Sequence, residues 1–149
     1  MARAAKATRS TRPEKSRSGE LWRLAGVGNS TAETVAAIEH GLPISAITEL
    51  RQVLREDEVD RLVIPRRTLA HRRLRGESLS MEESDRALRL ARVTTLAATT
   101  LGNEDKAMAW LRHEHRLFGG RRPLDLARTE AGARLVENML ARIAWGSAL

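Results

Sequence analysis

Apolar residues recur at steps of three and four along most of this chain, which is the spacing of one face of an α-helix. The pattern starts at Leu21 and continues to the last residues. No stretch shows the sustained alternation of apolar and polar residues that is typical of a half-buried strand. The sequence therefore predicts an all-α fold.

Two helices are expected in the first third of the chain. Ser30 and Glu33 have the spacing of a capping box, in which each side chain satisfies a backbone N–H group at a helix start. This motif predicts a helix over 31–40. Pro43, a residue favoured in a first helical turn, precedes an apolar stripe that predicts a second helix over 43–55.

Two shorter helices around a tight turn are expected over 56–76. Acidic residues open the first helix, Ile64-Pro65 ends it, and the second helix begins near Arg66. Leu69 is the main apolar residue of the second helix, and most of its remaining surface is basic. We predict a helix-turn-helix whose second helix binds DNA. The candidate DNA-binding residues are Arg66, Arg67, Thr68, His71, Arg72, Arg73 and Arg75.

Such a basic helix fits the major groove, where arginine binds guanine through two hydrogen bonds and other cations pair with phosphate. Two residues depart from the common motif, because Val63 replaces the usual turn glycine and Glu58 occupies a position that is often apolar. Two other interpretations remain open: a solvated helix of a bundle, and a surface for an acidic protein. Five arginines without an intervening acid repel one another, which favours an anionic partner.

The net charge of +7 is concentrated in two segments. Residues 1–19 contain six basic side chains and one acid, residues 66–75 contain five arginines and no acid, and residues 80–149 are nearly balanced. The first segment is poor in apolar residues, so we expect a disordered basic arm. Contact with DNA phosphates, a solvated leader without a partner, and an organellar transit peptide are its alternative roles.

The second half begins with another capping box, formed by Ser80 and Glu83, which predicts a helix of about five turns. Small apolar residues on one face permit close packing, so we expect this helix to be central. Gly102-Asn103 ends it. A shorter helix follows, with Trp110 beside its apolar face.

The segment "LFGGRRPLDLARTEAG" joins that short helix to the last one. A phosphate-binding loop would need a preceding strand and a Lys-Ser/Thr pair, which the segment lacks. We therefore interpret Gly119 and Gly120 as a turn, Pro123 as the start of a new turn, and Thr129 as the N-cap of the last helix. The inner stripe of that helix is expected to be Val136, Met139, Leu140 and Ile143.

Several classes of chemistry are disfavoured. Without cysteine the chain has no disulfide, thiolate zinc site or thiol nucleophile, and it lacks the sequence motifs of common hydrolases and nucleotide-binding enzymes. His113 and His115 would diverge by about 200° on a helix and could converge on one ion only if the helix has already ended. Without a sulfur ligand or a well-placed carboxylate nearby, a metal site is not expected there. We predict no catalytic residue, metal, cofactor or small-molecule substrate.

The sequence also has no apolar run for a membrane span or secretion signal, which predicts a cytoplasmic protein.

Four motifs in order resemble the Xre/MbcA/ParS family of bacterial antitoxins: W-L at 110–111, L-x-G-G-R-x-P-L-x-L at 117–126, T-E-x-G-A at 129–133 and R-I-x-W-G at 142–146. The resemblance covers about residues 40–146. It departs mildly at His113-Glu114-His115 and at Phe118.

The resemblance implies an Xre-like helix-turn-helix followed by a small helical toxin-binding domain, with divisions at 1–19, 20–78 and 79–149. It further implies a homodimer that binds operator DNA and represses its own operon. The protein partner would be a RES-domain toxin that consumes NAD, and the C-terminal end would block its active site. By position, the blocking residues are Arg142, Trp145, Gly146, Ser147, Ala148 and Leu149.

Three alternatives stay open. Trp145 could be a core residue of the last turn rather than a partner contact. The chain could be a helix-turn-helix repressor without a toxin partner, which the neighbouring gene would decide. It could also be a structural helical module, which absence of DNA and protein binding would favour.

Overall fold

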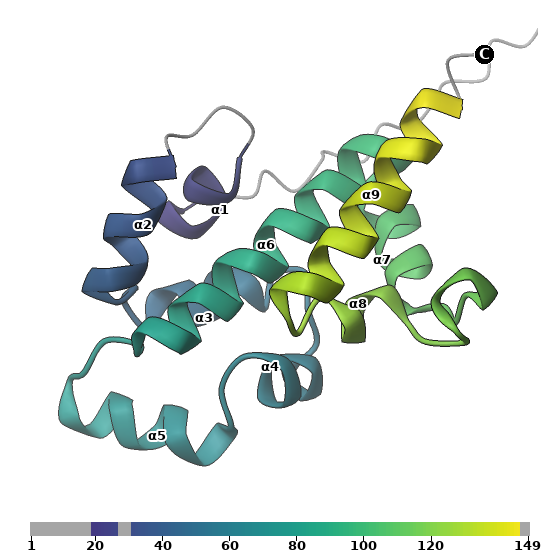
Figure 1. The fold of residues 1–149 in the computed structure, drawn as a ribbon. Helices are drawn as coiled ribbons and strands as arrows, with labels where there is room; N and C mark the ends of the chain where they lie inside the picture. Colours follow the sequence, from purple (N-terminus) through teal and green to yellow (C-terminus); the bar gives the residue numbers. More distant parts are fainter. Residues whose placement is uncertain (1–18, 27–30, 147–149) are drawn as a thin grey trace, which may run out of the picture.

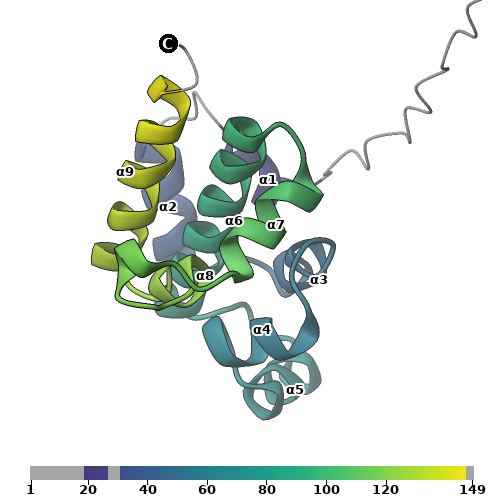
Figure 2. The same ribbon diagram turned by 90° about the vertical axis from the view of Figure 1, so that its right-hand side faces the viewer.

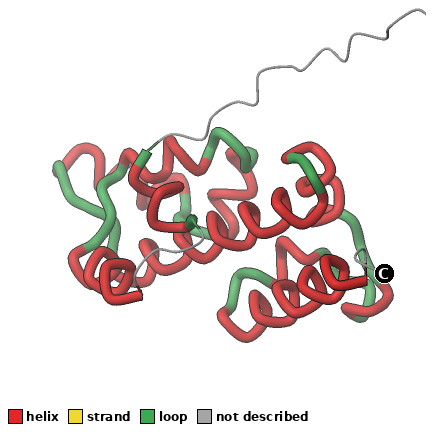
Figure 3. The backbone as a smooth tube through the Cα atoms, turned by 90° about the horizontal axis from the view of Figure 1, so that it is seen from above, coloured by secondary structure: helices red, strands yellow, loops and turns green. Residues whose placement is uncertain are grey.

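The computed structural model describes residues 19–26 and 31–146 of the chain. The described residues are all-α, as predicted, and their one pairing of extended backbone is an isolated antiparallel bridge (Figure 3). Residues 1–18 of the expected arm, Ser30, and Ser147, Ala148 and Leu149 lie outside the described ranges. The α-helices are α1 (Glu20–Ala25), α2 (Thr31–His40), α3 (Ser45–Leu50), α4 (Glu56–Leu62), α5 (Arg66–Arg75), α6 (Met81–Leu101), α7 (Glu104–Arg112), α8 (Pro123–Leu126) and α9 (Glu130–Gly146), and η1 (Arg116–Phe118) is a 3₁₀ turn.

The long helix α6 runs through the middle of the molecule, and α1, α2, α3, α7 and α9 all pack against it (Figure 1). Its N-terminus has the predicted capping box, because the Ser80 hydroxyl accepts from the Glu83 N–H group and the Glu83 carboxylate accepts from the Ser80 N–H group. Ala87, Ala91 and Ala97 are fully buried. Their small side chains let neighbouring helices approach closely, which confirms the prediction of a central helix.

The structure differs from the sequence prediction at two places near the N-terminus. The helix expected over 43–55 is shorter, since α3 covers only Ser45–Leu50. Turns whose hydrogen bonds mostly join residues three positions apart replace its two ends. The helix α1 was not predicted as a separate element. Its six residues are too few to show a helical period, although Leu21 and Leu24 are buried in the core.

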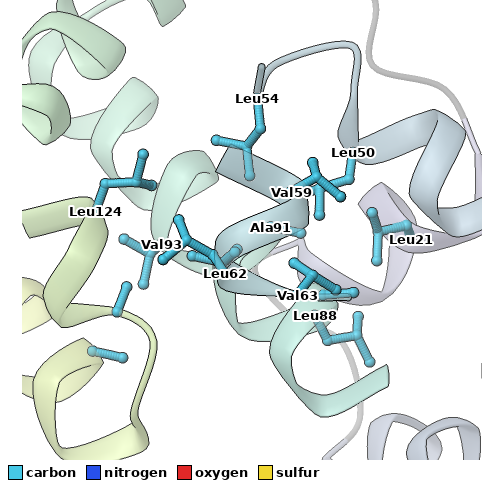
Figure 4. Close-up of a cluster of buried hydrophobic side chains, with 14 of the residues drawn as sticks. Leu21, Leu50, Leu54, Val59, Leu62, Val63, Leu88, Ala91, Val93 and Leu124 are labelled. Carbon is cyan, nitrogen blue, oxygen red and sulfur yellow. The ribbon is translucent and has the colours of Figure 1, made fainter. Parts of the chain in front are cut away.

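A continuous apolar core joins the two halves of the described chain. Figure 4 shows Leu62 and Val63, at the end of α4, beside Val93 and Leu88 of α6. Leu124 of α8 extends this cluster toward the C-terminal half. The helix-turn-helix segment is therefore packed onto the rest of the fold by its first helix. None of the described helices is long and apolar enough to cross a membrane.

Candidate functional site

The turn between α4 and α5 is well formed without glycine. Val63 has a negative φ of −119°, so a β-branched side chain fits there without strain. Its N–H group and that of Ile64 both donate to the Val59 carbonyl, at 2.9 and 3.1 Å. The Asp60 carboxylate accepts from the N–H group of Arg66 and so caps α5. Both turn side chains are buried, which holds α5 at a fixed angle to α4.

The basic helix α5 touches the core through one side chain, Leu69. At the lower end of the molecule in Figure 1 it projects away from the other helices. Of the candidate DNA-binding residues, Arg66, Arg67, His71, Arg73 and Arg75 are exposed, and Thr68 and Arg72 are half-buried. This exposure leaves most of the basic surface open to a partner.

The arginines of α5 differ in what they contact. Arg72 reaches the start of α6, where its guanidinium pairs with Glu83 at 2.8 Å and with Glu77 at 3.2 Å. Arg66 and Arg75 make longer, exposed ion pairs with Glu56 and Glu77, which are weak in water. Arg67 and Arg73 have no carboxylate partner among the described residues. Arg72 therefore attaches α5 to α6, while the other arginines remain available.

Glu58 is buried because it joins α4 to α7. Its side chain lies 2.6 and 2.9 Å from two nitrogens of the Arg112 guanidinium, and it also accepts from the Arg55 N–H group at 2.8 Å. Burial raises the pKa of Glu58, but hydrogen bonds from Arg112 and Arg55 outweigh that effect and hold the pKa below its ordinary value of 4.5. The sequence marked Glu58 as unusual but gave no signal for its partner 54 residues away.

The glycine turn predicted at residues 119 and 120 closes a short, ordered loop after α7. Gly119 and Gly120 have φ values of 65° and 80°, a left-handed backbone that favours glycine. The His115 N–H group donates to the Arg121 carbonyl at 3.2 Å, and the Gly120 N–H group donates to the His115 carbonyl at 3.0 Å. Phe118 packs edge-on against Trp110 beneath the loop. The loop therefore holds its arginines on a fixed backbone.

The T-E-x-G-A motif forms the start of α9. The Thr129 hydroxyl accepts from the Gly132 N–H group at 3.0 Å, which confirms the predicted cap. Glu130 receives hydrogen bonds from Arg89 and Arg92 of α6. A Cβ atom on Gly132 would lie 1.8 Å from the Leu126 carbonyl oxygen, so only glycine lets α8 and α9 pack this closely. This part of the family motif thus has a structural explanation.

The end of α9 has no such role in the core. Arg142, Trp145 and Gly146 are all exposed, and Trp145 is 78% exposed. The alternative that Trp145 is a core residue is therefore wrong. Leu135, also on α9, is 55% exposed. Figures 1 and 2 both show the C-terminal end of α9 at the opposite end of the molecule from α5.

His113 and His115 follow the end of α7 rather than lying on it. Their rings are 5.2 Å apart, and the Nε2 atom of His115 lies 2.9 Å from the Trp110 carbonyl oxygen. In the part of the chain that the structure describes, no group of three or more His, Asp or Glu side chains could hold a metal ion. His115 instead contributes to the packing of the loop.

Two family models match consecutive parts of the chain. Residues 33–92 match the helix-turn-helix domain of Xre-like antitoxins, and residues 96–146 match the C-terminal toxin-binding domain of Xre/MbcA/ParS antitoxins. The two matches meet within α6. The division at residues 78 and 79 remains a prediction.

Relatives from three bacteria are described as antitoxin Xre. The protein of Pseudomonas putida is 39% identical over 99 residues, which are 66% of this chain but only 62% of the relative's length. Proteins of Photorhabdus laumondii and Yersinia enterocolitica are each 29% identical, over 91% and 85% of this chain and 95% and 88% of their own lengths. With both domains matched in order, the chain belongs to the Xre/MbcA/ParS family of antitoxins.

Proposed function

We propose that the chain neutralises a RES-domain toxin that consumes NAD, and that it represses its own operon by binding operator DNA as a homodimer. The family membership supports the general role of an antitoxin. The observation that carries the specific proposal is the exposed end of α9, which lies within the segment matched to the toxin-binding domain. On this proposal the chain acts by binding and needs no cofactor or catalytic residue of its own.

The toxin-blocking surface consists of Arg142, Trp145 and Gly146, continued by Ser147, Ala148 and Leu149. A tryptophan that is 78% exposed loses little by leaving water and gains apolar contact on binding. Tryptophan and arginine are also the residues that most often dominate the free energy of a protein interface. A flat indole ring suits a pocket that accepts the planar rings of a dinucleotide, so Trp145 would obstruct NAD directly.

The DNA-binding surface is the outer face of α5. Leu69 anchors the helix, and Arg67, Arg73 and His71 are exposed with no ion pair among the described residues to compete with DNA. Arg66, Thr68 and Arg75 extend the same face, whereas Arg72 would contribute mainly by holding α5 in place. Because helix-turn-helix proteins commonly bind two half-sites one turn of DNA apart, a homodimer is part of the proposal.

The partner assignment is tested by expressing the chain with the product of the adjacent reading frame and purifying it by a tag. We expect the two proteins to copurify, and we expect the purified complex to consume no NAD while the separated partner does. An adjacent protein that consumes NAD equally well with the antitoxin bound would contradict the proposed blocking mechanism.

Operator binding is tested with the double variant Arg67→Gln/Arg73→Gln and a duplex from the chain's own promoter. Loss of two unpaired guanidinium groups should weaken binding about 10- to 100-fold and flatten its salt dependence by about one unit of slope for each lost phosphate contact. Arg134→Gln, which removes an exposed charge on α9, is the matched control. Equal affinity of the double variant and the parent chain would remove α5 from the interface.

A further inference from the structure

An open hollow of about 380 Å³ lies between α4 and the loop that joins α7 to α8. Figure 2 shows α8 beside α4, and the ion pair between Arg61 and Asp125 connects these two helices at 2.5 Å. The charged residues that line the hollow are Arg61, Arg121, Arg122, Arg128, Glu114 and Asp125. Most of these charges come from the segment 117–132, whose arginines the DNA-binding and toxin-blocking surfaces do not use.

The hollow carries an excess of positive charge. Among the described residues that line it, the one ion pair joins Arg61 to Asp125. Arg121 and Arg122 are exposed, and neither side chain has a carboxylate partner in the described ranges. Arg128 is also exposed. Its backbone binds Arg89 and Asp125, but its guanidinium has no carboxylate partner in the part of the chain that the structure describes. Three guanidinium groups thus face the hollow with Glu114 as their remaining counter-charge.

This arrangement suits an anion with oxygen atoms spread over its surface. A guanidinium group binds phosphate through two parallel hydrogen bonds, and like charges held near one another gain most from a polyanion. The backbone beneath Arg121 is fixed by its bridge to His115, so binding would not have to order the loop. A fixed set of arginines is therefore prepared for phosphate groups.

The position of the hollow favours one polyanion. Arg61, which lines the hollow, belongs to α4, the first helix of the helix-turn-helix. The turn after α4 leads directly into α5. The exposed end of α9 lies at the opposite end of the molecule from α5 (Figures 1 and 2). The hollow adjoins α4, so DNA bound by α5 that continues along α4 would reach it, whereas a toxin held at Trp145 would bind at the end of the molecule opposite α5.

We propose that Arg121, Arg122 and Arg128 form a second DNA contact, which binds the phosphate backbone beside the base pairs that α5 occupies. This inference rests on the proposed operator binding and extends it from the helix-turn-helix into the C-terminal domain. Phosphate contacts of this kind fix the position of a protein on the duplex without selecting its sequence.

The test is the double variant Arg121→Gln/Arg122→Gln, with duplexes of equal length from the promoter and from unrelated sequence. We expect about a tenfold loss of affinity for both duplexes at moderate salt. The negative slope of log K against log salt should become shallower by about two units, since each lost phosphate contact removes about 0.9 from its magnitude. Each single variant should show about half of this change in slope. Thermal unfolding should match the parent chain because both side chains are exposed, and protection against the toxin should match it because neither residue belongs to the proposed toxin-blocking surface.

The operator affinities of the two double variants, together with toxin protection by the Arg121/Arg122 variant, separate the possible failures. If Arg67→Gln/Arg73→Gln weakens operator binding but Arg121→Gln/Arg122→Gln does not, the second contact is wrong and the proposed function stands. If neither double variant weakens it, operator binding by α5 is wrong and the second contact falls with it. If the Arg121/Arg122 variant loses protection against the toxin while its salt slope is unchanged, the hollow belongs to the toxin interface and the proposal is overturned.

Discussion

Replacing Arg112 with methionine is expected to destabilise the folded chain by about 3 kcal/mol, at the lower end of the range for breaking a buried ion pair. The variant leaves the Glu58 carboxylate buried without its main partner. Glu58 is only 4% exposed, so water cannot replace the lost hydrogen bonds. The Arg112 side chain is 23% exposed, which is why the lower end of the range applies. Urea unfolding followed by circular dichroism measures the change.

A paired substitution serves as the control for this prediction. The double variant Glu58→Leu/Arg112→Met removes both charges and fills the space with apolar side chains, so it should regain most of the lost stability. If the double variant is no more stable than Arg112→Met, the loss comes from packing of the Arg112 stem rather than from an uncompensated charge.

The pH dependence follows from the same ion pair. Because the pKa of folded Glu58 lies below 4.5, its stabilising contribution is complete above pH 4.5 and is lost as the pH falls through the folded pKa. In Arg112→Met only Arg55 still opposes the effect of burial, so the pKa of folded Glu58 should be higher than in the parent chain. The difference in unfolding free energy between the two proteins should therefore narrow as the pH is lowered from 7 to about 4.

Local signals in the sequence were enough to predict much of the fold. Ser80 with Glu83 marked the start of α6, Thr129 marked the start of α9, and Gly119 marked the turn between α7 and α8. Each of these signals acts through backbone groups within about four residues, so a single sequence contains all the information it needs.

Contacts between distant residues could not be predicted in this way. The pairs of Glu58 with Arg112 and of Arg72 with Glu83 join different helices, and nothing in the local pattern indicates which arginine meets which acid. Gly132 appeared as one letter of a family motif, and its reason is the carbonyl of Leu126 on a neighbouring helix. The candidate surfaces were found from composition, but their placement at opposite ends of the molecule needed the tertiary structure.

Removing the end of α9 is expected to abolish protection against the adjacent toxin. A chain that ends at Ala141 loses Arg142 and Trp145 and all of the residues beyond them. The double variant Arg142→Ala/Trp145→Ala changes only exposed side chains, so it should keep the fold and should lose about as much protection. If tryptophan and arginine dominate this interface, their joint removal should weaken toxin binding by a factor of about 100 or more.

Growth and cellular NAD during co-expression with the adjacent toxin test the central claim most directly. Cells with the parent chain, or with Arg67→Gln/Arg73→Gln on the opposite end of the molecule, should grow and keep their NAD. Cells with Arg142→Ala/Trp145→Ala should stop growing and lose their NAD, although the variant is folded and still binds promoter DNA. Full protection by this folded variant would contradict the assignment of the end of α9 as the toxin-blocking surface.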